Sequence, residues 1–148
     1  NYDENLFLVL DDIQDPGNLG TIIRSAACFG VTNILASENT VDVYNPKVLR
    51  ACEGLLFQMN YKRGNLLEEL SKLKESHSII TTNVHEGQNI CETQINHFYA
   101  LIVGNEGNGV SEEVAKFAEH NVKIPMQKGC ESLNVAIATS ILLYELQK

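Results

Sequence analysis

Val-Gly-Asn-Glu-Gly-Asn-Gly-Val, residues 103–110, is the stretch of this sequence that decides the fold. The apolar run at residues 99–103 leads into it and predicts a buried strand. Ser111 and two acidic residues follow, and they predict a helix start, where a hydroxyl caps the first turn and the helix dipole favours acids. A glycine-rich loop past the end of a strand is where an open α/β sheet binds its ligand.

The spacing of the glycines excludes the common nucleotide-binding motifs. A dinucleotide fingerprint requires Gly-x-Gly-x-x-Gly, whereas Gly104, Gly107 and Gly109 are spaced three and then two residues apart. A P-loop requires Lys after its last glycine, and Val110 stands there instead. Glu106 would repel a phosphate, so the loop favours a ligand with a ribose, an amine or a positive charge. A tight strand-to-helix turn without a ligand is the equally weighted alternative.

Length and composition limit the class of protein. We expect 148 residues to form one domain, residues 1–148, with neither a signal peptide nor an apolar run of the roughly 18 residues that span a bilayer. The cysteines form no Cys-x-x-Cys pair and the histidines have no metal-ligand spacing, which predicts no metal site and a reducing cytoplasm. The net charge of −8 argues against broad non-specific nucleic-acid binding, so such a substrate would need a local basic patch or another domain.

Apolar runs alternate with segments of helical periodicity along the chain. We expect strands at residues 6–10, 32–36, 55–61, 78–82, 99–103 and 121–124. We expect helices around residues 19–29, 45–52 and 65–76, one from residue 111, and one that Ser132 caps and that runs to the C-terminus. This alternation predicts an α/β fold, a mostly parallel sheet with helices on both faces.

The last predicted helix is apolar on nearly every side between residues 133 and 146. A helix that is apolar all round is buried all round. At the end of a chain of 148 residues, one monomer has little left to cover its far side. We therefore predict that this helix packs against a second subunit, with complete burial inside the monomer as the alternative.

Three loops are expected at the same edge of the sheet, since each follows the carboxyl end of a predicted strand. They cover residues 12–24, 104–109 and 125–134. Each polar residue in them also has a simpler interpretation. Asn18 and Ser132 are good helix caps, Glu106 could brace its turn, and Arg24 and Asn134 could face solvent.

Taken together and in this order, the loops resemble the three motifs of the SpoU (TrmH-type) branch of the SPOUT RNA methyltransferases. The first motif matches through Asp12, Asp15, Pro16, Asn18, Gly20, Arg24, Ala26, Phe29 and Gly30. The second matches through Gly104, Asn105, Glu106, Gly107 and Gly109. The third matches through Ile124, Pro125, Met126, Ser132, Leu133 and Asn134. The resemblance covers essentially the whole chain.

The resemblance implies a fold and a function that periodicity does not. Pattern alone predicts an unknotted sheet, whereas the resemblance implies that the C-terminal part is threaded into a deep trefoil knot. It also implies an S-adenosylmethionine site in the knot, and a homodimer through the first and last helices. The reaction that it implies is methyl transfer to a ribose 2′-hydroxyl of RNA, with rRNA preferred over tRNA. A non-catalytic RNA-binding or assembly protein on the same fold is the alternative.

The resemblance carries over residue by residue. It implies catalytic positions at Arg24, Asn18, Glu106, Ser132 and Asn134. It implies cofactor contacts, largely through backbone groups and apolar contact with adenine, at Thr82, Asn83, Gly104, Asn105, Glu106, Gly109, Ile124, Met126, Ser132 and Leu133. An arginine in the position of Arg24 is often assigned as general base in the family. A guanidinium is rarely deprotonated, so we expect Arg24 to stabilise the developing 2′-oxyanion and to hold a phosphate.

RNA contacts are expected where basic residues gather. Lys47 and Arg50, with Lys62 and Arg63 beyond them, form a locally positive stretch in which Glu53 is the one acidic residue. Ordinary solvated charge is the alternative interpretation. The family usually has a small residue and then glycine soon after the position of Arg50, and Cys52-Glu53-Gly54 departs partly from that pattern. Many relatives carry a separate N-terminal RNA-binding domain, which would suit an acidic catalytic domain.

Overall fold

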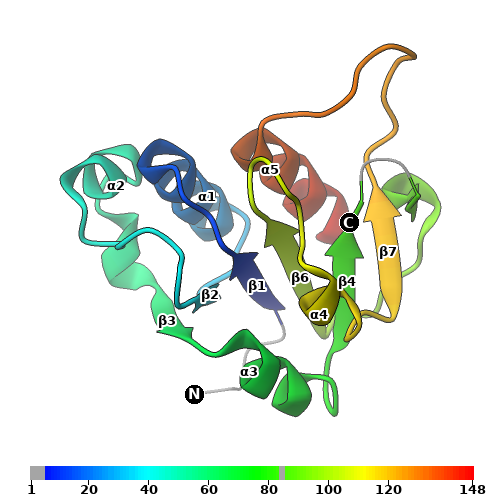
Figure 1. The fold of residues 1–148 in the computed structure, drawn as a ribbon, viewed down its shortest axis with the longest axis horizontal. Coiled ribbons are helices and arrows are strands. Elements are labelled where there is room, and N and C mark those ends of the chain that lie inside the picture. Colours follow the sequence, from blue (N-terminus) through cyan, green and yellow to red (C-terminus); the bar gives the residue numbers. More distant parts are fainter. Residues whose placement is uncertain (1–5, 84–85) are drawn as a thin grey trace.

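A computed structural model describes residues 6–83 and 86–148 of the chain. Its centre is a seven-stranded sheet in the order β3-β2-β1-β6-β4-β7-β5, and all of the strand pairs are parallel (Figure 1). The strands are β1 (Leu6–Asp11), β2 (Asn33–Ser37), β3 (Asn60–Gly64), β4 (Ser78–Thr82), β5 (Gln88–Asn89), β6 (Tyr99–Gly104) and β7 (His120–Lys123). The predicted parallel sheet is confirmed.

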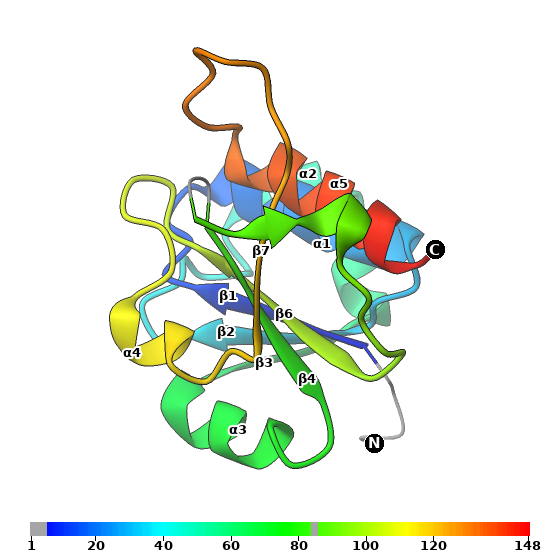
Figure 2. The ribbon, with the colours of Figure 1, turned by 90° about the vertical axis from the view of Figure 1, so that its right-hand side faces the viewer.

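Helices cover both faces of the sheet, as the alternating pattern predicts (Figure 2). One face carries α1 (Pro16–Cys28), α2 (Pro46–Ala51) and α5 (Val135–Leu146), and the other carries α3 (Leu66–Leu73) and α4 (Glu112–Ala115). Two short 3₁₀ helices, η1 (Leu55–Gln58) and η2 (Ile90–Glu92), complete the described elements. Side chains alternate across β1, so Leu8 and Leu10 pack toward α1 while Phe7 and Val9 pack toward α3.

Two predicted helix caps are wrong, and each is replaced by a neighbouring polar residue. Asp15 rather than Asn18 caps α1, because its carboxylate accepts the Asn18 N–H at 2.8 Å and Pro16 fills the first helical position. Asn134 rather than Ser132 caps α5, and its Oδ1 accepts the N–H groups of Ala136 and Ile137 at 2.8 and 3.2 Å. The last helix therefore begins two residues later than the sequence predicts, at Val135.

The predicted strand at residues 55–61 is also wrong. Residues 55–58 form η1, and the strand β3 begins only at Asn60. Gly54 has a φ of +81°, and the Leu55 N–H bonds to the Cys52 carbonyl at 3.1 Å, so the chain turns tightly before it can extend. Apolar composition alone does not distinguish such a turn from a strand.

Two apolar helix faces also differ from expectation. The helical spacing of the leucines on α3 predicts that Leu67 faces inward with Leu66, Leu70 and Leu73, but Leu67 is 36% exposed while the other three are buried. On α5, Ile137, Ile141 and Tyr144 are 53%, 36% and 48% exposed, and they follow one another at helical spacing. Complete burial of α5 inside the monomer is therefore wrong. Residues 83–98 have no clear helical or strand periodicity, which predicts mostly loop, but they contain β5 and η2; residues 84–85 lie outside the described part.

Candidate functional site

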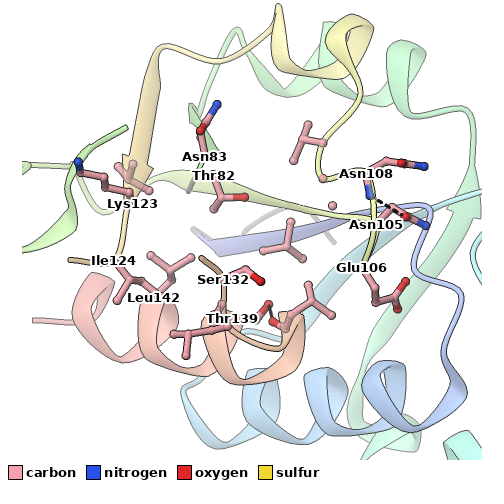
Figure 3. A pocket seen from close by; sticks show the side chains of 18 of the residues that line it. Thr82, Asn83, Asn105, Glu106, Asn108, Lys123, Ile124, Ser132, Thr139 and Leu142 are labelled. Atoms are coloured by element: carbon pink, nitrogen blue, oxygen red, sulfur yellow. Dashed lines mark hydrogen bonds between the residues drawn. The ribbon is translucent and has the colours of Figure 1, made fainter. Parts of the chain in front are cut away.

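A cavity of about 510 Å³ lies at the carboxyl ends of β4, β6 and β7, where α5 begins (Figure 3). A parallel sheet places the carboxyl ends of its strands at one edge, which explains why distant loops meet there. The second and third predicted loops form much of the wall. All of the residues that the sequence predicts as cofactor contacts line this cavity: Thr82, Asn83, Gly104, Asn105, Glu106, Gly109, Ile124, Met126, Ser132 and Leu133.

The glycine-rich loop is shaped by its own hydrogen bonds. Asn105 and Gly109 exchange backbone N–H···O bonds of 3.1 and 2.9 Å, which closes the loop. The Asn105 side-chain oxygen accepts the N–H groups of Gly107 and Asn108 at 2.9 and 3.0 Å. A Cβ at Gly104 would overlap the backbone of Gly109 and Val110, so this position requires glycine for a close approach of two backbone segments. These internal hydrogen bonds and the close approach at Gly104 account for the shape of the loop.

The first and second loops are joined through Glu106. Its Oε1 accepts the Asp15 N–H at 3.1 Å, and its Oε2 accepts the Gln14 N–H at 3.2 Å. The Asn105 Nδ2 donates to the Asp12 carbonyl at 2.8 Å, which ties the same two segments together. Glu106 thus lies on the cavity wall and braces the chain just before α1, and the simpler interpretation of this residue accounts for both of these bonds.

The other walls combine hydrogen-bonded polar groups with apolar side chains. The Thr82 hydroxyl donates to the Ile102 carbonyl at 3.2 Å, and the Asn83 backbone N–H donates to the Val122 carbonyl at 3.0 Å. Thr139 on α5 is fully buried, and its hydroxyl donates to the Val135 carbonyl at 2.7 Å. The charged residues that line the cavity are two carboxylates, Glu106 and Glu131, and one lysine, Lys123. Because the negative charges outnumber the positive one, the cavity suits a ligand that carries positive charge.

Sequence reasoning missed the part of the wall that α5 contributes. Val135, Ala138, Thr139 and Leu142 line the cavity along one side of this helix. A helix that is apolar all round gives no sign of which side faces a cavity. Two hydroxyl side chains stand in the middle of this helix, but only Thr139 lines the cavity, whereas the Ser140 hydroxyl lies 2.6 Å from that of Ser25 on α1, so the sequence gives no clear signal.

Asn18 and Asn134 join two helix starts beside the cavity. The Asn134 Nδ2 donates to the Asn18 Oδ1 at 3.0 Å, so the beginnings of α1 and α5 are linked across 116 residues of sequence. Neither residue is among those that line the cavity. The structure therefore places this pair next to the residues that the sequence predicts to contact the cofactor, and outside the cavity lining itself.

Arg24 lies apart from the cavity. Its side chain is 52% exposed on α1, and its Nη1 pairs with Oε1 of Glu53 at 3.1 Å. Folding is expected to gather Arg24, Glu106 and Asn134 around a single pocket, but of these three residues only Glu106 lines the cavity, and Arg24 lies farther along α1. The physical reason is that α1 leads away from the edge of the sheet at which the cavity lies, and Arg24 is two turns along it.

The expected basic stretch does not form one surface. Lys47 and Arg50 are exposed on α2, and the Arg63 Nη1 donates to the Thr40 carbonyl at 3.5 Å. Lys62 points to the other face of the sheet, where its ammonium pairs with Glu69 at 2.7 Å, because successive residues of a strand point to opposite faces. Only part of the stretch therefore shares a side with α2.

Two absences concern the described residues. Within residues 6–83 and 86–148, no group of three or more histidine, cysteine, aspartate or glutamate side chains is arranged to hold a metal ion. Within the same ranges, no helix has both the length and the apolar character needed to cross a membrane.

Comparison with known proteins gives one consistent family. The model of the SpoU rRNA Methylase family matches residues 5–144. The 23S rRNA (guanosine(2553)-2′-O)-methyltransferase RlmP of Bacillus subtilis (strain 168) is 38% identical over 141 residues, which are 95% of this chain and 57% of that protein. The chain spans little more than half the length of the first curated relatives that it matches.

Solved structures agree with this assignment. The SpoU methyltransferase AviRb from Streptomyces viridochromogenes, in complex with the cofactor AdoMet, matches with a TM-score of 0.90 and 28% identity, over 99% of this chain and 58% of that one. The AdoMet-bound rRNA methyltransferase from Sinorhizobium meliloti matches with a TM-score of 0.88 and 31% identity, over 98% of this chain and 56% of that one. Because the family match extends over nearly all of the sequence, as the three motifs predict, this protein is a member of the SpoU rRNA methylase family.

Proposed function

We propose that this protein transfers a methyl group from S-adenosylmethionine to a ribose 2′-hydroxyl of RNA, and that the RNA is ribosomal. The observation that carries the proposal is the cavity between the glycine-rich loop and the start of α5, in a chain of this family. The names of similar proteins support the substrate. RlmP is named as a 23S rRNA 2′-O-methyltransferase, and so is a relative from Streptomyces viridochromogenes that is 29% identical. Methylation of tRNA is the second candidate, supported by a structural neighbour named as a tRNA modifying enzyme.

The cavity fits S-adenosylmethionine in size and in chemistry. Its volume of about 510 Å³ lies within the roughly 300–1,000 Å³ typical of cofactor sites. Ile124, Leu133 and Leu142 offer apolar contact for adenine, and the backbone of the glycine-rich loop can approach closely because Gly104 has no side chain. Glu106 places negative charge on the wall, which suits a sulfonium. When bound, this cofactor supplies the methyl group.

Arg24 acts on the RNA in this proposal. Its guanidinium stabilises the negative charge that develops on the 2′-oxygen as the hydroxyl proton passes to water, and it holds a neighbouring phosphate with two parallel N–H donors. Lys47 and Arg50 on α2 contact the RNA backbone farther out. Arg24→Lys keeps the charge but loses the fork geometry, so near-normal turnover of that variant across pH would refute the bidentate role.

The active form in this proposal is a homodimer that packs through α1 and α5. The support is the exposed apolar stripe of Ile137, Ile141 and Tyr144, which one chain leaves uncovered. Since α1 also carries Arg24, dimerisation would place the guanidinium at the subunit boundary rather than inside the cavity of one chain. The resemblance further supports a deep trefoil knot formed by the C-terminal part and an N-terminal RNA-binding domain in the whole protein, and the spacing of the cysteines supports a cytoplasmic location.

Methyl transfer can be tested directly. In the first experiment, wild-type protein is incubated with in vitro transcribed 23S rRNA and S-adenosylmethionine labelled in its methyl group. In the second, primer extension maps the 2′-O-methyl sites in rRNA from cells that lack the gene and from cells that have it. We expect label in the rRNA and the loss of one mapped site. Binding of S-adenosylmethionine is measured by calorimetry in parallel. A dimer that binds no S-adenosylmethionine and labels no RNA would favour the non-catalytic alternative.

A further inference from the structure

Glu53 combines an unusual backbone conformation with an unusual partner. Its φ is +52°, and among the non-glycine residues of the described chain only Asp12 shares a positive φ. Its carboxylate, 62% exposed, pairs with the Arg24 guanidinium at 3.1 Å. Gly54 follows with a φ of +81°, so two left-handed residues in succession end α2.

Stability does not explain a glutamate at this position. A left-handed conformation is costly for a residue with a side chain, and glycine would adopt it freely. An exposed ion pair returns little, because water screens it and two long side chains lose freedom in forming it. Strain that the fold does not need is typical of positions where a side chain serves a function.

The surrounding structure holds the Glu53 backbone at a fixed place relative to Arg24. A Cβ at Gly20 would overlap the Ala51 side chain, so α1 and α2 are in close contact at that point. Arg24 lies one helical turn beyond Gly20, and Glu53 lies two residues beyond Ala51. The Glu53 N–H also bonds to the Arg50 carbonyl at 3.3 Å. The ion pair is therefore an extension of a rigid helix–helix contact.

We propose that Glu53 is a positioning residue that orients the Arg24 guanidinium for RNA, an inference that rests on the proposed function. In the described structure, Nη1 is the guanidinium atom that is hydrogen-bonded, so the Nε and Nη2 donors remain free for a phosphate or a developing 2′-oxyanion. An unrestrained arginine would lose rotamer freedom when it meets its substrate, and the pair with Glu53 removes much of that freedom beforehand.

The test compares Glu53→Ala, Glu53→Gly and Glu53→Gln with Glu75→Ala, which removes an exposed carboxylate at the end of α3 on the other face of the sheet. Methyl transfer to 23S rRNA is measured with each variant. We expect Glu53→Ala and Glu53→Gly to lower kcat by about 2- to 5-fold, the range that an exposed ion pair can supply, with an unchanged KM for S-adenosylmethionine. Glu53→Gln keeps an acceptor oxygen and should recover part of the loss, while Glu75→Ala should match the wild type.

Two further measurements separate positioning from folding. Glu53→Gly removes the backbone strain, so its Tm should rise while its kcat falls, which a merely structural role would not produce. Arg24→Ala combined with Glu53→Ala should be no slower than Arg24→Ala alone, because Glu53 acts through Arg24. Wild-type kcat in Glu53→Gly, or losses that multiply in the double variant, would overturn the proposal.

A readout that needs no activity keeps this inference distinct from the proposed function. The order parameter of the Arg24 Nε–Hε bond is measured by NMR in the protein without RNA. We expect higher order in the wild type than in Glu53→Ala. Equal order in the two proteins would refute the positioning role, whereas a wild-type protein that methylates no RNA, with Arg24 ordered by Glu53, would refute the proposed function alone.

Discussion

At the residue scale, the cavity depends on positions at which one extra atom does not fit. Gly104 ends β6 and lies directly against the backbone of Gly109 and Val110, so the loop cannot close around a side chain there. Gly107, only three residues away, has ordinary space around it. The two glycines look alike in the sequence, and only the first is required by packing.

Gly104→Ala should distort the loop and weaken the cofactor site. A Cβ would overlap two backbone segments that have no flexible end to move aside, so we expect a loss of roughly 1–3 kcal/mol in the free energy of unfolding. Calorimetry should show much weaker S-adenosylmethionine binding. Gly107→Ala is the matched control, because its Cβ would meet only the Asn105 side-chain oxygen at 3.5 Å. Equal effects of the two substitutions would contradict this account.

Tyr99 should make the protein sensitive to alkali. It is 2% exposed at the start of β6, and burial raises its pKa from 10.0 to about 12. The folded state then holds the phenolic proton more tightly than the unfolded state, so this stability is present below pH 10 and is lost between pH 10 and 12. The full shift corresponds to roughly 3 kcal/mol.

Thermal unfolding between pH 9 and 12 measures this effect. Tyr99→Phe should show a shallower fall of Tm with pH than the wild type. Some of the fall should remain, because burial also raises the pKa of Tyr61 to about 12. Identical pH profiles for the wild type and Tyr99→Phe would show that Tyr99 is not responsible.

At the element scale, α1 and α2 are held together by the contact between Gly20 and Ala51. This contact fixes where α2 ends and hence where Glu53 lies. The sequence places Gly20 on the apolar side of α1, but it does not indicate which element approaches there. That partner is decided by the connection through β2, which brings α2 back beside α1 on the same face of the sheet.

Gly20→Ala should therefore separate the two helices. Its Cβ would overlap the Ala51 side chain and approach the Val48 carbonyl at 2.7 Å, so we expect a loss of roughly 1–3 kcal/mol despite the better helix propensity of alanine. Chemical denaturation measures the change. Gly64→Ala at the end of β3 is the control, since its Cβ would meet nothing within 4 Å. A Gly20→Ala protein as stable as the wild type would rule out the close contact.

At the scale of the whole molecule, one face of α5 remains uncovered. Ile137, Ile141 and Tyr144 form an exposed apolar stripe in the single chain. A stripe of this kind is typical of a surface that packs against a partner, and the proposed homodimer would cover it.

Ile141→Lys should yield a monomer if this proposal is correct. The substitution places a charge in the middle of the stripe, which is unfavourable when the surface is buried against another chain. Sedimentation velocity measures the oligomeric state. Leu67→Lys is a matched control, because Leu67 on α3 is also 36% exposed and lies on the other face of the sheet. A wild-type protein that sediments as a monomer would refute the dimer.

The sequence by itself determined the order of most strands and helices, the edge of the sheet at which the cavity lies, and the family. Apolar runs, glycine spacing and polar loop residues are local signals, and they carry this information without tertiary contacts. The structure alone decided that Asp15 and Asn134 cap their helices, that residues 55–58 turn rather than extend, and that α5 contributes to the cavity wall. It also decided that Arg24 pairs with Glu53 and lies outside the cavity. These features depend on contacts between elements that are far apart in the sequence, and a local sequence pattern does not show which distant elements will pack together.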